Sequence, residues 1–425
     1  MSLSKKVAET IVNKFPKLTA IPIECCLFKV QSQLRQVNEA AYEPQLLAIG
    51  PYHRGKACLQ GMEGIKLQYL QLLLSRLNET SVERYTEAME VLREKAVKCY
   101  SESTELTEEE FIQMLVLDGI FIVELFRNYQ MEDPREVSDP ISSSEDMHFR
   151  IERDLLVYEN QLPFFILEKL FTMSENPTSP SNHTLIDLAQ KFFNLTVHPI
   201  SDNLVQESRH LLGLVRIRMN LIAAQQRIIN TNAIVRTGDW ELMPSATALW
   251  EFGVKFRPAS KPSIFDIQFN DGLMLIPPLR IDDRVESILR NLIAVEQYTK
   301  VGKINFIIDY VYLIESLIKS PKDVEFLTRK GIIKHGLGDH GAVSLLFNRL
   351  AENVNFSENS AYCHLLNEVN KYCNSRQNTW MAKLRHTYLS SPWTLISLLM
   401  GMLMLLFGAI QALFSVLSYI SPKGM

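Results

Sequence analysis

The most pronounced hydrophobic pattern of the chain is an uninterrupted apolar run near its C-terminal end. Residues 393–420 read WTLISLLMGMLMLLFGAIQALFSVLSYI, and no Asp, Glu, Lys or Arg occurs from His386 to Pro422. A helix of this length reaches about 42 Å, and a bilayer core needs roughly 20 apolar residues. Trp393 and Tyr419 lie near the two ends, where such rings anchor at headgroups. The pattern predicts one transmembrane helix; a buried core helix, the alternative, would carry a polar stripe.

The charges around this run predict how it crosses the membrane. Three basic residues precede the span and one follows it: Arg376, Lys383, Arg385 and, on the far side, Lys423. The positive-inside rule then places the N-terminal body in the cytosol and leaves only the short tail 421–425 beyond the membrane. A body facing outward would instead expose four glycosylation sequons, which we interpret as unused: Asn78, Asn182, Asn194 and Asn355.

Small residues recur near heptad spacing on one face of the predicted transmembrane helix: Gly401, Gly408, Ala412 and Ser415. Small residues let a second helix approach closely, so this face indicates self-association in the membrane. The alternative is that these residues are scattered on a lipid-facing helix. The expected partners are therefore the lipid bilayer, and through this face a second copy of the chain.

The rest of the chain is dominated by apolar patterns typical of helices. Residues 107–127, TEEEFIQMLVLDGIFIVELFR, begin with a capping box in which Thr107 is the N-cap and Glu110 follows three residues later. The apolar run is too short to span a bilayer and is predicted to lie in a core. Asp118 interrupts this run, and a buried carboxylate must be partnered or protonated. A structural hydrogen bond and a functional role both remain open for Asp118.

A second apolar segment, residues 154–171, reads DLLVYENQLPFFILEKLF and predicts two helical pieces around a break. Pro163 suits the first turn of the second piece. Glu159 and Asn160 at the break are candidates to cap a helix end, and Glu159 is also a candidate catalytic carboxylate. Two polar stretches without an apolar period are predicted to be loops, at residues 130–147 and 174–184.

The pattern changes from helical to alternating at about residues 252–281. Two alternating runs within residues 263–282 flank Asn270-Asp271-Gly272, and Asp-Gly between such runs is a strong hairpin signal. Residues 252–257, FGVKFR, predict a third strand. The expected fold is therefore mainly α (α+β): one large helical domain over residues 1–385 that contains a small antiparallel sheet.

Composition narrows the functional classes further. The 425 residues are 47% hydrophobic and 22% charged, as in ordinary packed proteins. A net charge of −4 gives no reason to expect nucleic acid as a partner. The six cysteines form no C-x-x-C pair, which argues against a zinc site, and their sparseness argues against a disulfide scaffold. No dinucleotide fingerprint, H-E-x-x-H or G-x-S-x-G motif occurs, so neither cofactor, metal nor assembled catalytic motif is expected.

The stretch GPYHRGKA, residues 50–57, matches most of a phosphate-binding loop but lacks its chemistry. Ala57 stands where Ser or Thr would hold magnesium, and Pro51 removes a backbone N–H where donors are needed. The glycines at 61 and 64 disfavour a helix that starts at Lys56. No alternation of strands and helices follows to build a parallel sheet. Phosphate binding is therefore not expected here.

Several blocks of the chain, taken in order, resemble a large plant family known as domain of unknown function 247, which includes UPF0481-like membrane proteins. These blocks are LRQVNEAAYEPQLLAIGPYHRG, MLVLDGIFIVELFR, DLLVYENQLPFFILEKLF, RNLIAVEQ and SPWTLISLLMG. The resemblance implies a plant protein of the plasma membrane with one C-terminal membrane helix. Some members are associated with self-incompatibility in grasses, which implies recognition or signalling. The chain departs from the family pattern at Arg54 and at Val30-Gln31, which weakens the case for a fixed catalytic site in this strip.

Two functional hypotheses follow. The first is a single-pass, tail-anchored protein whose cytosolic body binds other proteins and recruits them to a membrane, without enzymatic activity. The second is a membrane-attached hydrolase or transferase that uses His53 with Asp118 or Glu159. The second hypothesis requires these side chains to converge within hydrogen-bond reach in a pocket.

Overall fold

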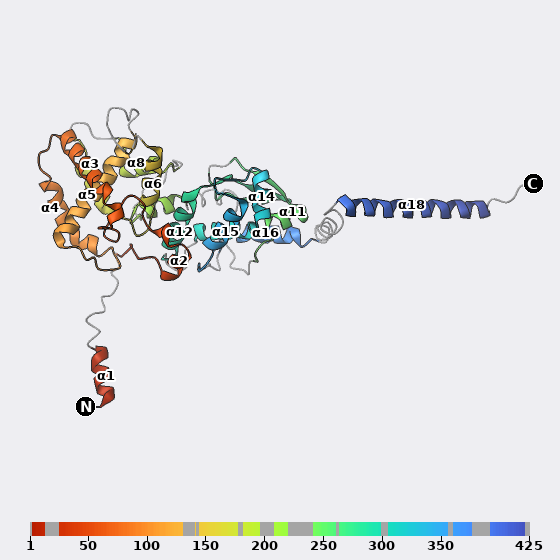
Figure 1. Ribbon diagram of the computed structural model, residues 1–425, viewed down its shortest axis with the longest axis horizontal. Helices are drawn as coiled ribbons and strands as arrows, with labels where there is room; N and C mark the ends of the chain where they lie inside the picture. Colours follow the sequence, from red (N-terminus) through yellow and green to blue (C-terminus); the bar gives the residue numbers. More distant parts are fainter. Residues whose placement is uncertain are drawn as a thin grey trace, which may run out of the picture. The chain divides into compact units, whose positions relative to one another are not determined.

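A computed structural model describes the following residues of the chain: 2–12, 25–130, 141, 144–176, 182–195, 208–219, 241–260, 263–298, 305–355, 360–375 and 392–420. Among these residues helices dominate, two small sheets occur in the second half, and one apolar helix lies near the C-terminus (Figure 1). The mainly α fold with a small β region, expected from the sequence, is confirmed.

The described chain groups into two compact units, each assembled from separate stretches of sequence. Unit 1 comprises Met1–Ile234, Asp282–Ile308 and Arg349–Phe356. Unit 2 comprises Val235–Ile281, Asp309–Asn348 and Ser357–Met425. The single domain expected over residues 1–385 stays a prediction, because compactness does not decide whether the units fold separately.

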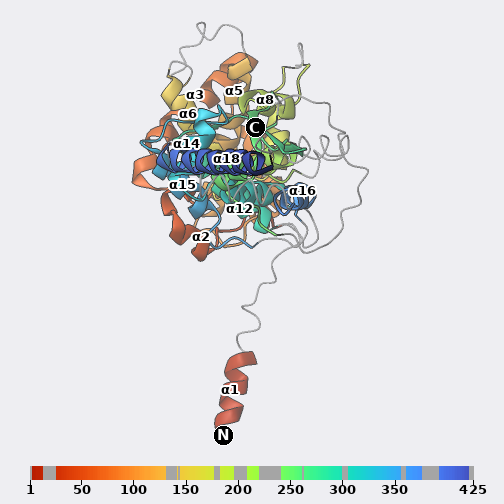
Figure 2. The ribbon, with the colours of Figure 1, turned by 90° about the vertical axis from the view of Figure 1, so that its right-hand side faces the viewer.

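Unit 1 is a helical unit. Its elements are α1 (Leu3–Val12), α2 (Ser32–Val37), η2 (Glu39–Tyr42), η3 (Ala57–Leu59), α3 (Gly61–Leu77), α4 (Glu83–Val97), α5 (Glu108–Gln130), α6 (Glu145–Leu155), α7 (Phe164–Met173), α8 (Leu185–Phe192) and α12 (Asp283–Gln297). Helix α5 packs against α3, α4, α7 and α8, and α3, α5 and α8 lie close together in both views (Figures 1 and 2). It is therefore the central helix of the unit.

Helix α5 follows directly from the sequence signals of residues 107–127. Thr107 Oγ1 accepts a hydrogen bond from the N–H of Glu110 at 3.3 Å, and Glu110 accepts one from the N–H of Thr107 at 2.8 Å, so the capping box forms. Every residue from Met114 to Phe126 is buried. Gly119 leaves no room for a Cβ against Leu170 of α7, so the two helices approach closely at this point.

The break predicted within residues 154–171 is confirmed, because α6 ends at Leu155 and α7 begins at Phe164, directly after Pro163. The loop expected over residues 130–147 is bounded by Gln130, the last residue of α5, and by α6, for which Ser144 is the N-cap. Residues 131–140 of that loop, and 177–181 of the loop expected at 174–184, lie outside the described residues.

Unit 2 contains the strands. Strands β2 (Gln268–Asn270) and β3 (Leu273–Ile276) form the expected antiparallel hairpin. Asp271 and Gly272 between them both have positive φ, 43° and 77°, as the tightest hairpin turns require.

The third strand, β1 (Lys255–Pro258), exists as expected but pairs with β3 in parallel, so an all-antiparallel sheet is wrong. The sheet order is β1-β3-β2. The hairpin leaves the other edge of β3 open, and the chain between β1 and β2 is long enough to pass from one edge of the sheet to the other. A second sheet pairs β4 (Leu279–Ile281) with β5 (Ile333–His335), also in parallel.

The remaining helices belong wholly or mostly to unit 2: α11 (Ala246–Glu251), α13 (Phe306–Leu317), α14 (Pro321–Arg329), α15 (His340–Leu350), α16 (Cys363–Cys373) and α18 (Pro392–Ile420). Helix α18 is continuous (Figure 1). Its segment Leu399–Leu417 has a mean hydropathy of 2.1 and no buried residue, so it could span a membrane. The expected membrane-spanning length is thus present as one helix.

The details predicted for this helix are only partly within the described structure. Gly401, Gly408, Ala412 and Ser415 are exposed on α18, and a Cβ at either glycine would have nothing within 4 Å. Self-association through this face stays a prediction. The side chains of Trp393 and Tyr419, and the tail 421–425, lie outside the described residues.

Candidate functional site

A short segment of unit 1 without regular secondary structure, residues 45–50, is held by buried side chains. The carboxylate of Asp154, in the last turn of α6, accepts hydrogen bonds from three consecutive backbone N–H groups, those of residues 45–47, at 2.7 to 3.0 Å. Arg153 donates to the same carboxylate at 2.8 Å. Burial raises the pKa of Asp154 even though these donors oppose the shift. The carboxylate is therefore committed to fixing the backbone.

Asn160 holds the next part of the segment. Its Oδ1 accepts from the N–H of Ile49 at 2.7 Å, and its Nδ2 donates to the carbonyls of Leu47 and Asp154, both at 2.9 Å. The side chain is fully buried. Asn160 thus caps a carbonyl at the end of α6 and ties the break after α6 to residues 47–49.

Asp118 holds the end of the segment. Its Oδ2 accepts from the N–H of Gly50 at 2.9 Å, and its Oδ1 accepts from Lys66 Nζ of α3 at 2.6 Å. Lys66 is fully buried and also donates to the carbonyl of Ala48 and to Glu63, each at 2.6 Å. Burial raises the pKa of Asp118, and the nearby Lys66 ammonium opposes that shift. The carboxylate that interrupts the apolar run is therefore paired with a buried lysine.

These contacts occupy the groups that a phosphate-binding loop would offer to a nucleotide. The N–H of Gly50 points to a protein carboxylate, and the ammonium group of Lys56 forms an ion pair with Glu43. Gly50 and Gly55 have φ of 72° and 84°, which glycine adopts without the steric cost that other residues bear. The glycines of GPYHRGKA therefore serve the path of the backbone.

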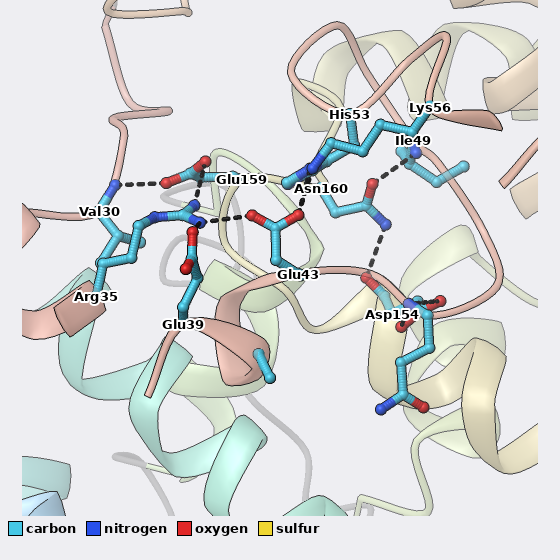
Figure 3. A network of polar contacts seen from close by, with 12 residues as sticks. Val30, Arg35, Glu39, Glu43, Ile49, His53, Lys56, Asp154, Glu159 and Asn160 are labelled. Carbon is cyan, nitrogen blue, oxygen red and sulfur yellow. Dashed lines mark hydrogen bonds and ion pairs between the residues drawn. The ribbon is translucent and has the colours of Figure 1, made fainter. Parts of the chain in front are cut away.

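Glu159 joins the N-terminal segment to the same network (Figure 3). Its Oε1 accepts from the N–H of Val30 at 2.7 Å, and its Oε2 accepts from Arg35 Nη2 at 2.8 Å. Arg35 also donates to Glu43 at 2.5 Å and lies 3.7 Å from Glu39. The side chain of Glu159 is only 4% exposed, so both oxygens are used inside the protein.

His53 lies beside Glu43 (Figure 3). Its Nδ1 is 3.3 Å from Glu43 Oε2, although neither ring nitrogen makes a hydrogen bond within the described part of the chain. Burial lowers the pKa of His53 to about 4, and the Glu43 carboxylate opposes that shift. The imidazole is therefore neutral at neutral pH. Glu43 itself is 30% exposed and carries ion pairs to Lys56 and Arg35.

The combination of His53 with Asp118 or Glu159 is not assembled as the second hypothesis requires. Across the described ranges, no hydrogen bond or ion pair joins His53 to either carboxylate, and each of those carboxylates has other partners. The carboxylate next to His53 is Glu43, which sequence reasoning did not select. A usable signal was present, because Glu43 lies between Arg35 and His53 in the first family-like block.

Helix α12 brings a further family-like block, RNLIAVEQ, to the network. Asn291 Oδ1 accepts from the N–H of Tyr158 at 2.8 Å, and its Nδ2 donates to the carbonyl of Ala41 at 2.9 Å. Ser287 donates to the same carbonyl at 2.6 Å. Four of the blocks that carry the family resemblance therefore converge on one network within unit 1. Its side chains hold irregular backbone in place through hydrogen bonds.

The fold and this network define a class: a mainly helical protein with a clamped polar core and a C-terminal helix able to cross a membrane. Residues 27–407 match the model of the DUF247 family, described as plant protein of unknown function, and the chain belongs to this family.

Two relatives from Arabidopsis thaliana are similar over most of their length. The UPF0481 protein At3g47200 is 30% identical over 427 residues, which cover 94% of this chain and 88% of that protein. The putative UPF0481 protein At3g02645 is 20% identical over 476 residues, covering 91% and 89%. No solved structure matches the chain significantly. The similarity therefore establishes the family and leaves the activity open.

Proposed function

We propose that the protein is a single-pass, tail-anchored membrane protein whose cytosolic body binds other proteins and recruits them to the membrane. The observation that carries this proposal is the exposure of α18: Leu399–Leu417 contains no charged residue, has a mean hydropathy of 2.1, and none of it is buried. An apolar helix of this size is unfavourable in water. The fourteen Leu, Ile, Phe and Val residues of the apolar run 393–420 favour insertion into a bilayer by roughly 4–8 kcal/mol in total.

The polar core of unit 1 supports a binding role over a catalytic one. Three buried carboxylates accept hydrogen bonds from backbone N–H groups and from cationic side chains of the protein, those of Asp118, Asp154 and Glu159. Such groups rigidify a scaffold when they are satisfied. A rigid body on a membrane anchor is suited to holding a partner at the bilayer. We therefore expect no enzymatic activity from this network.

The orientation and the choice of membrane belong to the same proposal. The excess of basic residues before the span favours a cytosolic body. The family resemblance favours the plasma membrane of a plant cell and a role in signalling or recognition.

The second candidate, a membrane-attached hydrolase or transferase, retains one supporting observation. His53 Nδ1 lies 3.3 Å from Glu43 Oε2, a distance at which a carboxylate can orient an imidazole. Against it, His53 is 2% exposed, so a substrate has little access to the ring.

The proposal is tested by comparing the full chain with a version lacking residues 391–425 in plant cells. We expect the full chain to resist alkaline carbonate extraction and the shortened chain to be soluble. An unrelated tail-anchor helix fused in place of α18 is the matched control and should restore membrane retention. Membrane retention of the shortened chain would contradict the anchor, and a set of proximity-labelled proteins that is unchanged on truncation would contradict recruitment.

A further inference from the structure

Unit 1 contains a pocket that the polar network does not use. Its volume is about 630 Å³, and it is formed by the last turn of α5, α6 from its start to Glu152, the end of α8 with the residues just after it, and the start of α12. The residues that matter for its chemistry are Asn128, Tyr129, Glu145, His148, Phe192 and Arg284. Two helices end and two begin at this pocket, so their dipoles largely cancel. The lining side chains therefore determine whether the pocket favours a cation or an anion.

One wall of the pocket is aromatic. The rings of Tyr129 and His148 stack with centroids 4.9 Å apart and planes 7° apart. The ring of Phe192 packs in a T-shaped arrangement against both, with centroid distances of 5.2 Å to Tyr129 and 4.9 Å to His148. Burial lowers the pKa of His148, with a smaller contribution from Arg284, so the imidazole is neutral at neutral pH. Tyr129 is 44% exposed, which leaves part of its ring available to a ligand.

The positive and negative side chains that line the pocket differ in whether the protein already pairs them. Its one cationic side chain among the described lining residues, Arg284, is held by Glu152 at 2.8 Å and Asp282 at 2.9 Å, and it stacks on the ring of Phe149. Its positive charge is therefore neutralised within the protein. Glu145, in the first turn of α6, is exposed and has no ion pair or hydrogen bond within the described residues.

We propose that this pocket binds the guanidinium or ammonium group of an Arg or Lys side chain in a basic segment of a partner protein. A cation gains from the Glu145 carboxylate, which no described residue pairs, and from the face of Tyr129. An anion meets two carboxylates and an arginine that is already paired. The volume exceeds what one guanidinium group fills, so it accommodates the stem of the side chain and neighbouring peptide. This inference rests on the proposed function and names the class of partner.

Direct binding tests the inference with the full chain in lipid nanodiscs. The probe is an acetylated and amidated Gly-Arg-Gly-Arg-Gly peptide, and its control is the same peptide with citrulline, which keeps the shape and removes the charge. We expect calorimetry to detect the arginine peptide, with affinity that falls as salt rises. The citrulline peptide should bind at least tenfold more weakly. Equal binding of the two peptides would overturn the inference.

Variants locate the binding site. Glu145→Gln should weaken the arginine peptide about fivefold to tenfold, and Tyr129→Leu by a similar factor. Glu83→Gln is the matched control, because Glu83 is also an exposed acid in the first turn of a helix, α4. It should leave binding unchanged. Binding that is unaffected by Glu145→Gln, in a variant with unchanged thermal unfolding, would place the cation elsewhere and overturn the inference.

Two further measurements separate the possible sources of the cation and the two proposals. Spermidine is titrated in parallel; spermidine binding that depends on Glu145, without peptide binding, would assign the pocket to a small polyamine and refute a partner segment. Membrane retention of Glu145→Gln is followed by carbonate extraction and should equal that of the unaltered chain. Peptide binding in nanodiscs can thus fail while anchoring holds, and anchoring can fail while peptide binding holds.

Discussion

Lys66 and Asp118 form an ion pair that is closed to solvent on both sides. Lys66 Nζ lies 2.6 Å from Asp118 Oδ1, and the two side chains are 0% and 1% exposed. The pair joins α3 to α5, and both partners also bind the backbone of residues 48–50. Buried charges persist in a fold only when each has a partner. The two helices and the segment 45–50 are therefore coupled through this contact.

Lys66→Met should destabilise the protein strongly, because it leaves the Asp118 carboxylate buried without its cation. Breaking one side of a buried pair costs about 3–5 kcal/mol. Urea unfolding of the full chain in detergent, followed by far-ultraviolet circular dichroism, measures the loss of stability of the helical unit 1. The double variant Lys66→Met with Asp118→Leu is the control and should recover part of it, since no uncompensated charge remains. A loss below about 1 kcal/mol in the single variant would contradict the buried pairing.

Gly50→Ala should cost more stability than Gly55→Ala, although both glycines have positive φ. A Cβ at Gly50 would lie 2.6 Å from the carbonyl oxygen of Gln161, whereas a Cβ at Gly55 would meet nothing within 4 Å. The left-handed backbone alone costs an alanine about 1–2 kcal/mol, and overlap adds about 1–3 kcal/mol at Gly50. The difference between the two variants in urea unfolding isolates the overlap. Equal losses would show that the backbone conformation alone requires glycine.

Local signals account for the parts of the fold that the sequence predicts well. The capping box at Thr107 and the apolar run after it specify α5 without reference to the rest of the chain. Asp271-Gly272 specifies the β2–β3 hairpin in the same way, because few residue pairs tolerate two positive φ angles. The pairing of β3 with β1, on the other edge of β3, has no such local signal. Parallel pairing with β1 depends on a connection across the sheet, and no local pattern encodes it.

From the sequence, the candidate site could be predicted only as a set of buried polar residues, each of which requires a partner. Burial of Asp118 requires a partner, but Lys66 is far from it in sequence and meets it only because α3 packs against α5. The same holds for Glu43, whose closeness to His53 depends on the path of residues 43–53. Composition marks such residues as candidates. Which carboxylate meets which cation is decided by helix packing.

Enlarging the small residues of α18 should reduce self-association in the membrane. Gly401→Leu with Gly408→Leu fills a face where no neighbouring atom limits a side chain, so the helix itself is expected to remain intact. Close approach of two helices requires small residues at their contact. Energy transfer between donor-labelled and acceptor-labelled chains in vesicles measures the effect. Leu406→Phe on the opposite face is the control. Unchanged energy transfer in the glycine variant would contradict dimerisation through this face.

The buried imidazole of His53 should make stability fall in mild acid. Its pKa in the folded protein is about 4, below the ordinary value of 6.5. As the pH falls below 6.5, the unfolded chain therefore binds a proton before the folded chain does, and the folded state loses stability until about pH 4. The full shift corresponds to about 3 kcal/mol. This contribution is complete above pH 6.5 and gone below pH 4.

His53→Gln isolates that contribution, because other buried groups also titrate and His210 has a pKa lowered to about 3. Urea unfolding of the full chain at a series of pH values from 7 to 4 gives the free energy of unfolding for both proteins. The unaltered chain should lose about 3 kcal/mol more than His53→Gln across this range. Parallel pH profiles would show that the imidazole protonates freely in the folded state. Since burial is what separates the structural role of His53 from that of a general base, parallel profiles would favour the enzymatic alternative.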